Sequence, residues 1–261
     1  MIDFIYKRSV VSIREMAFGS YSDILLKGCT VAYMHSSDQV CKLQQKPNCL
    51  IELQDTLVTD LNKSEDELFS LIGKTCRYEI RRAEKEDIVV TMYGSDIPNE
   101  ILVQFENTYN NMFSSKGMTN KFNHSLFTEG CKNKQVFVSC STSIEKSCSV
   151  FHAYLCDGKN TVLMYSASPI WDKRDKQTVN KIGRMNKHLH WKDILEFKRL
   201  GYKCYEWGGL KSFSKPNGID LFKMEFGGNH KQYFNYTIGK GLLGLAYVYL
   251  VRRKNHERID N

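Results

Sequence analysis

The spacing of apolar residues changes along the chain and predicts a mixture of strands and helices. The segments 23–36 and 48–60 hold short apolar runs with polar breaks, which is typical of strands. Ser64 followed by Glu67 forms a capping box and predicts the start of a helix. This helix continues over 68–87, is interrupted near Gly73, and has one apolar face made of Leu68, Leu71, Ile72, Cys76, Ile80 and Ala83.

From residue 87 onward, strands and helices are predicted to alternate. The predicted strands are 87–94, 135–142, 147–156, 160–168, 202–209 and 230–238. The predicted helices are 99–113 after Pro98, 123–130, the second half of 172–201 up to Gly201, and the short segment 218–228. The pair Asp157-Gly158 predicts a hairpin between two of these strands, because glycine accepts the positive φ of a tight turn.

These elements predict an α/β (α+β) fold with helices packed on a mixed, largely antiparallel sheet. The chain shows no internal repeat and no linker rich in Gly, Ser or Pro. We expect a soft boundary near residues 90–97. It divides a smaller N-terminal half, 1–96, from a C-terminal domain, 97–261.

Composition and net charge reduce the number of function classes that fit this chain. With 42% hydrophobic and 12% aromatic residues, the 261-residue chain can form a core, which excludes a disordered protein. The net charge of +8 suits an anionic ligand such as a nucleotide, coenzyme A, a nucleic acid or an anionic lipid surface. A basic surface that serves only solubility is the alternative.

The cysteines indicate a reducing compartment. There are nine, an odd number, with no C-x-x-C pair and no apolar leader before them. We interpret them as reduced thiols of a cytoplasmic protein and expect no metal site.

The last apolar stretch, 242–251, is too short to cross a bilayer and is followed by Arg252, Arg253 and Lys254. We expect a final helix packed in the core. A membrane-surface anchor is the alternative.

The segment 218–228 contains the strongest candidate for chemistry. Lys223 stands between Phe222 and Met224 and, if it points into a cleft, could stabilise negative charge in an acyl transfer. It could equally extend into water. Glu206 and Asp220 could pair with it or accept the proton of an attacking amine, and Asp220 could instead cap the helix.

A second candidate is the basic segment 173–187, which leads into the helix predicted in the second half of 172–201. Backbone N–H groups at a helix start bind phosphate, and Gly183 would let the backbone approach a ligand. A solvated basic loop is the alternative. The cations in question are Lys173, Arg174, Lys176, Lys181, Arg184 and Lys187.

Three further candidates each have a structural alternative. His152 could be a base or a satisfied buried histidine. Trp207 could stack on a sugar or base ring or fill the core. Arg77 and Arg81, with Arg82, could bind a phosphate of the acceptor or face solvent.

Several short motifs follow one another in an order that resembles a known family. They are Tyr165-Ser166-Ala167-Ser168, the helix start 186–191, Tyr205-x-Trp207-Gly208-Gly209 and Phe222-Lys223 with Gly227-Gly228. Together with the basic segment 76–90, they resemble the Fem-type peptidyl and acyl transferases of the GNAT superfamily. The resemblance covers residues 74–90 and about 160–230, which is under half of the chain.

The resemblance implies a GNAT-like fold, often built as two related halves, and transfer of an acyl group to an amine by direct attack. It implies that the acyl donor lies between two splayed strands, here 147–156 and 161–168. It places Lys223 at the transfer centre. The chain is short and has no long charged helical pair, which favours a compact donor over an aminoacyl-tRNA.

We therefore predict a cytoplasmic N-acyltransferase, monomeric or homodimeric and not inserted in a membrane. Its cofactor is coenzyme A, with acyl-CoA as donor, and its acceptor is a nucleotide-linked (dTDP- or UDP-) amino-deoxyhexose for surface polysaccharide. An aminoacyl-tRNA-dependent peptidyltransferase acting on a peptidoglycan precursor is the alternative enzyme. A non-catalytic basic binding module is the alternative from another class.

The predicted site residues form three groups. The predicted catalytic residues are Lys223, Glu206, His152 and Asp220. The predicted contacts of the cofactor are Tyr154, Leu155, Lys181, Gly183, Arg184, Asn186 and Lys187. The predicted contacts of the acceptor are Arg77, Tyr78, Arg81, Tyr165, Ser168, Trp207, Gly208 and Phe222.

Overall fold

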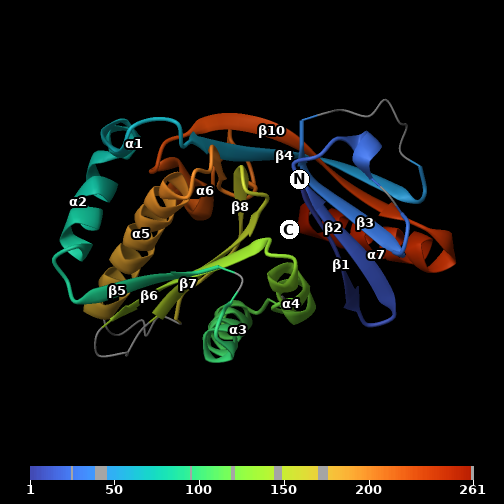
Figure 1. The fold of residues 1–261 in the computed structure, drawn as a ribbon, viewed down its shortest axis with the longest axis horizontal. Coiled ribbons are helices and arrows are strands. Elements are labelled where there is room, and N and C mark those ends of the chain that lie inside the picture. Colours follow the sequence, from blue (N-terminus) through green and yellow to red (C-terminus); the bar gives the residue numbers. More distant parts are fainter. Residues whose placement is uncertain are drawn as a thin grey trace. The chain divides into compact units, whose positions relative to one another are not determined.

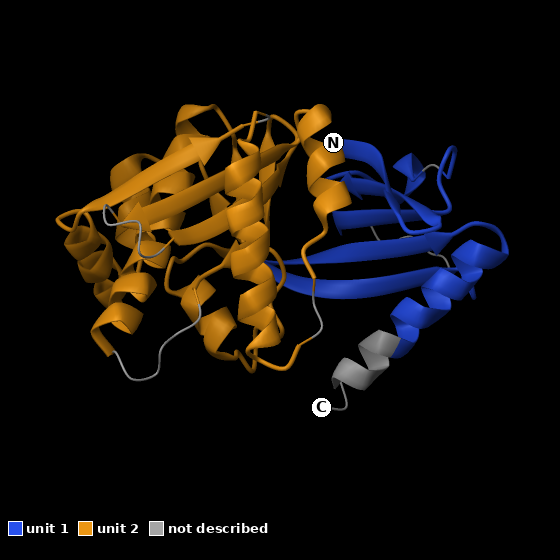
Figure 2. Cartoon of the chain, turned by 90° about the horizontal axis from the view of Figure 1, so that it is seen from below, with its two compact units in different colours: residues 1–56, 231–261 blue, residues 57–230 orange. Residues whose placement is uncertain are grey.

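The computed structural model describes residues 1–24, 26–38, 46–94, 96–118, 121–143, 149–169 and 176–259. Cys41, Cys148, Lys173 and Arg174 lie outside these residues. The chain forms two compact units, residues 1–56 with 231–261 and residues 57–230 (Figure 2). The boundary expected near residues 90–97 falls inside the second unit, and a related N-terminal half stays a prediction.

The first unit is a small sheet with one long helix. Its strands lie in the order β1-β2-β3-β10-β4, with β2 and β3 parallel. Met16, Met34 and Tyr236 are buried at its centre. The elements are β1 (Ile2–Arg8), β2 (Val11–Ala17), the 3-10 turn η1 (Tyr21–Asp23), β3 (Val31–Ser37), β4 (Cys49–Asp60), β10 (Asn229–Gly239) and α7 (Gly241–Ile259).

The second unit holds the candidate motifs. Its strands lie in the order β4-β9-β8-β7-β6-β5. Within the described residues, β8 and β9 are parallel and the other neighbouring pairs are antiparallel. This confirms the predicted mixed, largely antiparallel sheet. The elements are α1 (Glu65–Leu71), α2 (Lys74–Ala83), β5 (Ile88–Tyr93), α3 (Asn99–Ser114), α4 (His124–Lys132), β6 (Val136–Ser143), β7 (Ser149–Cys156), β8 (Asn160–Ala167), α5 (Lys176–Arg199), β9 (Cys204–Glu206) and α6 (Gly218–Met224).

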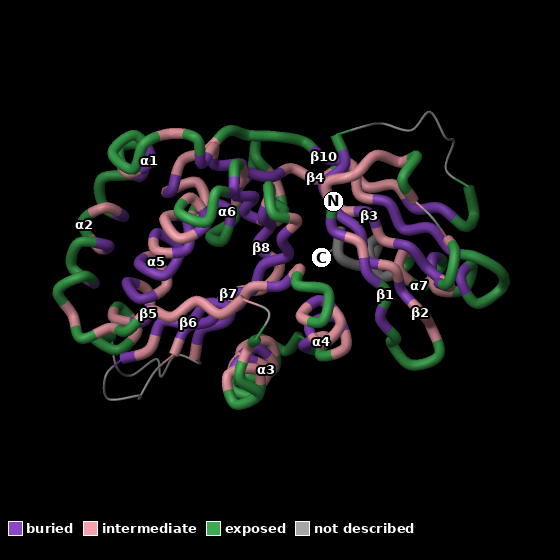
Figure 3. The backbone as a smooth tube through the Cα atoms, viewed as in Figure 1, coloured by how far each residue is buried: buried purple, intermediate pink, exposed green. Residues whose placement is uncertain are grey.

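Helices cover both faces of this second sheet (Figure 1). Helix α5 packs on β5, β6 and β7 and carries α2 on its outer side, whereas α3 contacts β8 and α4 contacts β6. Alternation along β7 separates the faces: Tyr154 packs on Phe197 of α5, and Phe151 stacks on Phe105 of α3. Most of α5 is buried or half-buried (Figure 3). A polar group that α5 turns toward the sheet is therefore removed from water.

Short sequence motifs predicted several helix boundaries correctly. Ser64 and Glu67 form the predicted capping box at the start of α1. The interruption near Gly73 is a break between α1 and α2, where the Gly73 N–H donates to the carbonyl of Glu225 at 2.7 Å. Helix α3 begins directly after Pro98, as predicted.

Two expectations about helices are wrong. Helix α5 begins at Lys176 rather than near Asn186, because Ile182, Met185 and Leu189 already recur at helical spacing and pack on Val150. The basic residues from 181 to 187 are thus helical and not in a loop. The final helix α7 is also not enclosed by the core, since Leu242 is 87% exposed.

Candidate active site

The sheet of the second unit forks between β8 and β9. These strands pair at three positions, Asn160 with Cys204, Thr161 with Tyr205 and Val162 with Glu206. Strand β9 then ends, whereas β8 continues to Ala167 with β7 as its described strand neighbour. We call this divergence beyond Val162 and Glu206 the β8–β9 fork.

The prediction that segments 147–156 and 161–168 splay apart is wrong. Strands β7 and β8 pair from Cys156–Thr161 to Phe151–Ala167, with one bulge at Ala153 and Tyr154. A hairpin turn joins them, so their hydrogen bonds start at the turn and run along both strands. Strands β8 and β9 are joined through α5 instead, and such a crossover leaves their far ends able to part.

Gly208 lets the chain pass close to β8 at the start of the fork. Its φ is +61°, and a Cβ there would overlap the carbonyl oxygen of Leu163. Gly227, with φ +73°, similarly approaches the carbonyl of Leu71, 2.9 Å from the position of its Cβ. The two glycine pairs therefore bring the segments before and after α6 against backbone of neighbouring elements.

The substitution Gly208→Ala is expected to lower the free energy of unfolding by about 2 kcal/mol, because it adds both a strained φ and a backbone overlap. Urea unfolding of the variant measures this. Gly201→Ala is the matched control, since Gly201 also has a positive φ, +87°, but has nothing within 4 Å of a Cβ. Equal losses in the two variants would show that the approach to Leu163 is unimportant.

Lys223 lies beside the fork. Its Nζ donates to the carbonyl oxygens of Gly208 at 2.5 Å and Gly209 at 2.8 Å, directly after β9. Burial lowers the pKa of Lys223 to about 8, and the negative charges of Asp220 and Glu206 partly oppose this shift. Two carbonyls thus hold a partly desolvated ammonium group whose third hydrogen can serve a ligand.

The two carboxylates near Lys223 occupy different surroundings. Glu206 ends β9 and is 3% exposed. Asp220 is 2% exposed and accepts N–H bonds from Lys211 at 3.0 Å, Ser212 at 3.3 Å and Asn217 at 3.1 Å. Asp220 therefore fixes the loop before α6 and the start of that helix, the capping role left open above.

A chain of buried polar side chains connects α5, β9 and β7. His190 Nδ1 lies 2.9 Å from the Tyr205 hydroxyl, which lies 2.9 Å from the Tyr154 hydroxyl. Tyr154 donates to Asp193 at 2.5 Å, and Asp193 contacts His152 Nδ1 at 2.7 Å. We call these five side chains the buried relay.

His152 is one end of the buried relay. Its Nε2 lies 2.7 Å from the Asn186 amide oxygen, so both of its ring nitrogens have partners. His152 is fully buried. It therefore has the structural role of a satisfied histidine, the alternative given above, and a role as base stays a prediction.

His190 is the other end of the buried relay, and the charge of Lys223 acts on it. Burial first, and then the charges of His152 and Lys223, hold the pKa of His190 well below its usual value, so its imidazole is neutral at pH 7. Its ring also packs on Trp207, Phe222 and Phe226, with centroids at 4.9, 5.6 and 5.5 Å.

His190 and Asp193 were missed as site residues. Their signal in the sequence is their spacing from Asn186 and Phe197, which puts all four on the helix face that also carries Leu189 and Ile194. Polar residues on a buried face need partners, and here they find them in β7 and β9.

The relay contains the residue types of a metal site but not its geometry. Ligand atoms of His152, His190 and Asp193 lie within 4.8 Å of one another. The two imidazoles are stacked, however, with centroids 3.8 Å apart and planes at 27°. Lone pairs of ring nitrogens lie in the ring planes, so stacked rings do not converge on one ion. The arrangement favours a hydrogen-bonded cluster.

The predicted cofactor contacts on α5 are mostly engaged with protein groups. Arg184 bonds Glu86 through Nε at 2.9 Å and through a second nitrogen at 2.6 Å. Lys187 lies 2.7 Å from Glu79 and 2.5 Å from Glu225. Lys181 and Gly183 are half-buried in the same helix, and Tyr154 and Leu155 are buried in β7. Their contacts to a cofactor stay predictions.

The predicted acceptor contacts do not lie in one place. Arg77, Tyr78 and Arg81 lie on α2, where Arg77 donates to the Ser70 carbonyl at 2.9 Å and Arg81 lies 5.1 Å from the centroid of the Phe69 ring. Tyr78 is 64% exposed. The remaining five lie elsewhere in the unit: Tyr165, Ser168, Trp207, Gly208 and Phe222.

Among those five, only some border the Lys223 neighbourhood. Trp207 is fully buried, and its indole N–H donates to Thr59 at 3.0 Å, which is the core role left open above. Phe222 is half-buried against His190. Tyr165 packs among Tyr109, Phe122 and Phe127 on the α3–α4 side. Ser168 is buried just beyond the end of β8.

Only the comparison of structures finds proteins that are similar to this chain. No protein-family model matches this sequence, and no curated protein matches it. Among solved structures, FemX is 13% identical with a TM-score of 0.53, over 76% of this chain and 63% of FemX. This chain therefore spans less than two thirds of the length of FemX.

Two other similar structures match along nearly the whole chain. The C-terminal domain of a putative lysylphosphatidylglycerol synthetase from Agrobacterium fabrum is 12% identical with a TM-score of 0.56, over 95% of this chain and 83% of that domain. L-PGS from Bacillus licheniformis is 14% identical with a TM-score of 0.54, over 96% of this chain and 84% of L-PGS. The predicted Fem-type, GNAT-like fold is thereby confirmed.

Proposed function

We propose that this chain transfers an acyl group to a primary amine at the β8–β9 fork, with Lys223 beside the reacting carbonyl. The observation that carries the proposal is the position of this lysine. Its ammonium is partly desolvated, held by the Gly208 and Gly209 carbonyls, and placed where two parallel strands part. A cation fixed in this way stabilises an oxyanion more than a mobile cation in water does.

The proposed chemistry is a direct displacement. The neutral amine attacks the activated carbonyl, a C–N bond forms, and the carbonyl oxygen takes the negative charge. The C–S bond of the thioester then breaks, the amine proton passes to a base or water, and the thiol leaves. Lys223 would hold the oxyanion while this occurs.

Glu206 is our candidate for the proton acceptor. It is the last residue of β9, next to the fork, and its charge acts on Lys223. A carboxylate can take the proton of the attacking nitrogen as the C–N bond forms when it lies within hydrogen-bond reach of that nitrogen.

We propose acyl-CoA as the donor and a nucleotide-linked amino sugar as the acceptor. The net charge of +8 suits two anionic substrates. Helix α5 begins shortly after β8 ends at the open side of the fork, and a helix N-terminus is a favourable place for the donor phosphates. We place the reaction in the cytoplasm because the seven described cysteines are all free thiols.

A specific observation favours a second donor, aminoacyl-tRNA. The similar structures with TM-scores above 0.5 include FemX, L-PGS and a domain of a putative lysylphosphatidylglycerol synthetase. The last name describes attachment of an amino acid, lysine, rather than of a fatty or acetyl group. The same fork and the same lysine would serve either ester.

Coenzyme A at about 100 times its Kd is expected to raise the Tm by about 5 °C, since binding to the folded state adds about 2.7 kcal/mol. Differential scanning fluorimetry measures this, with ATP as the control for unspecific polyphosphate binding. No shift with coenzyme A, together with tight and steeply salt-dependent binding of tRNA, would exclude the first donor and favour the second.

A further inference from the structure

The terminal helix α7 turns an apolar face to solvent. Leu242, Leu245, Ala246, Tyr249 and Leu250 recur at the spacing of one helical face, and all five are exposed. Leu242 is 87% exposed, and Tyr249 and Leu250 are each 61% exposed. Leu243 adds to the edge of this face and is 58% exposed. We call these six residues the α7 apolar face.

The opposite side of α7 explains why these residues are not in the core. Gly244 and Val248, one turn apart, are buried. A Cβ at Gly244 would lie 2.7 Å from the carbonyl oxygen of Thr30, so the helix docks through its backbone. Tyr247 adds a hydroxyl contact of 2.9 Å to Tyr33. The narrow glycine side packs, and the wide leucine side remains uncovered.

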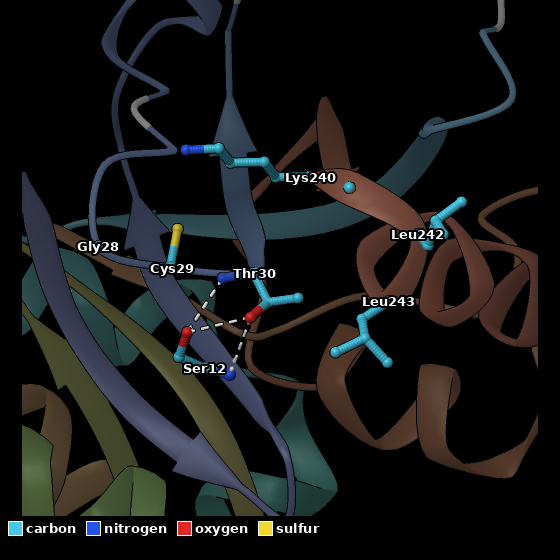
Figure 4. A pocket seen from close by; sticks show the side chains of 8 residues that line it. Ser12, Gly28, Cys29, Thr30, Lys240, Leu242 and Leu243 are labelled. Atoms are coloured by element: carbon cyan, nitrogen blue, oxygen red, sulfur yellow. Dashed lines mark hydrogen bonds between the residues drawn. The ribbon is translucent and has the colours of Figure 1, made fainter.

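The α7 apolar face is also hollowed and bounded by cations. A hollow of about 510 Å³ is lined by Pro47, Leu242, Leu245, Ala246, Tyr249, Leu250 and Arg252. Lys240 precedes the helix and lines a second pocket with Leu242 and Leu243; its side chain extends toward the loop of Gly28 and Cys29 (Figure 4). Arg252 and Arg253 stand at the other end of the face, and no acidic residue occurs between 240 and 254 in the sequence.

We propose that α7 docks this protein on an anionic bilayer, lying in the plane of the interface with its apolar face among the acyl chains. Apolar side chains on one face of a helix, flanked by basic residues, are the features of an interfacial helix. The leucines would leave water, while Lys240 and Arg253 would meet lipid phosphates.

The charges favour a bilayer over a second copy of the chain. Cations lie at both ends of the α7 apolar face, so pairing two such helices in either direction sets cations against cations. An anionic surface complements both ends at once. No helix in the described ranges is long and apolar enough to span a bilayer, and interfacial docking needs no span. The proposal stands apart from the acyl transfer proposed above.

Flotation with lipid vesicles tests the proposal on the full chain. We expect binding to vesicles of equimolar phosphatidylglycerol and phosphatidylcholine, and about tenfold weaker binding to phosphatidylcholine alone. The double variant Leu242→Gln/Leu250→Gln should lower the partition coefficient about tenfold or more, because it removes two large apolar contacts with the lipid. Lys240→Glu/Arg253→Glu should weaken binding to the anionic vesicles only.

The matched control is Val103→Gln on α3, a change at an apolar residue that is 44% exposed and far from α7 in sequence. It should bind as the parent does, and all variants should keep the parent Tm because the altered side chains are exposed. Absence of binding to anionic vesicles, or binding unaffected by Leu242→Gln/Leu250→Gln, would overturn the proposal. A dimer in sedimentation velocity that this double variant dissociates, without vesicle binding, would assign the face to a second copy instead.

Discussion

Replacing Lys223 with methionine is expected to lower turnover by about a hundredfold or more and to shift the Tm by no more than a few degrees. Methionine keeps most of the length of the side chain but has no charge and no hydrogen to donate. If the ammonium stabilises the oxyanion, its loss costs about as much as removal of one oxyanion-hole donor, 10²–10³ in rate. The measurement is thiol release from acetyl-CoA with a dTDP-linked amino sugar as acceptor.

The control for this prediction is Lys223→Arg, whose activity is measured as a function of pH. The pKa of Lys223 is about 8, so the parent enzyme carries the ammonium below this pH and loses it as the pH rises through this value. Activity that needs the cation should fall on the alkaline side of pH 8. Arginine stays charged throughout that range, so the variant should lack this fall. Unchanged turnover in Lys223→Met would remove this lysine from the site.

Replacing Asp193 with alanine is expected to lower the free energy of unfolding by about 3–4 kcal/mol. Asp193 is 1% exposed and is the point where two branches of the buried relay meet. Its loss removes the carboxylate that the Tyr154 hydroxyl and His152 Nδ1 contact at 2.5 and 2.7 Å, and leaves the Tyr154 hydroxyl with its contact to Tyr205. It also opens a cavity between α5 and β7. Urea unfolding measures the effect.

Asp193→Asn is the matched control, because the amide keeps the size of the side chain and an oxygen that accepts from Tyr154. We expect it to lose less than half as much stability as the alanine variant. Burial raises the pKa of the Tyr154 phenol well above its usual value, so this hydroxyl keeps its proton to donate. A loss below about 1 kcal/mol in Asp193→Ala would mean that the relay contributes little to the fold.

The motifs that we propose as the site were identified where their residues lie close in sequence. The Phe222-Lys223 pair, the two glycine pairs and the strand that ends at Glu206 lie between residues 204 and 228, and local spacing placed them together. His190 and Asp193 belong to the same region of space but reach it from α5. Their roles depend on which face of α5 meets the sheet, and a sequence without contacts does not state this for a helix with apolar residues on several sides.

The position of the fork could not be read from the sequence for a related reason. The sequence around 147–168 describes two good strands, and so does the structure, but whether neighbouring strands stay paired depends on their connection. A tight turn at Asp157-Gly158 keeps β7 with β8, whereas the crossover through α5 lets β8 and β9 separate.

By itself, the sequence determined the period of most elements, the capping of α1, the start of α3 and the mixed α/β class. These depend on residues within a few positions of one another, where side-chain spacing and caps act directly on the backbone. Tertiary structure alone decided the partners: the carboxylates that engage Arg184 and Lys187, the two carbonyls that hold Lys223, and the side of α7 left in solvent. Such choices are made between segments far apart in sequence, through burial and charge.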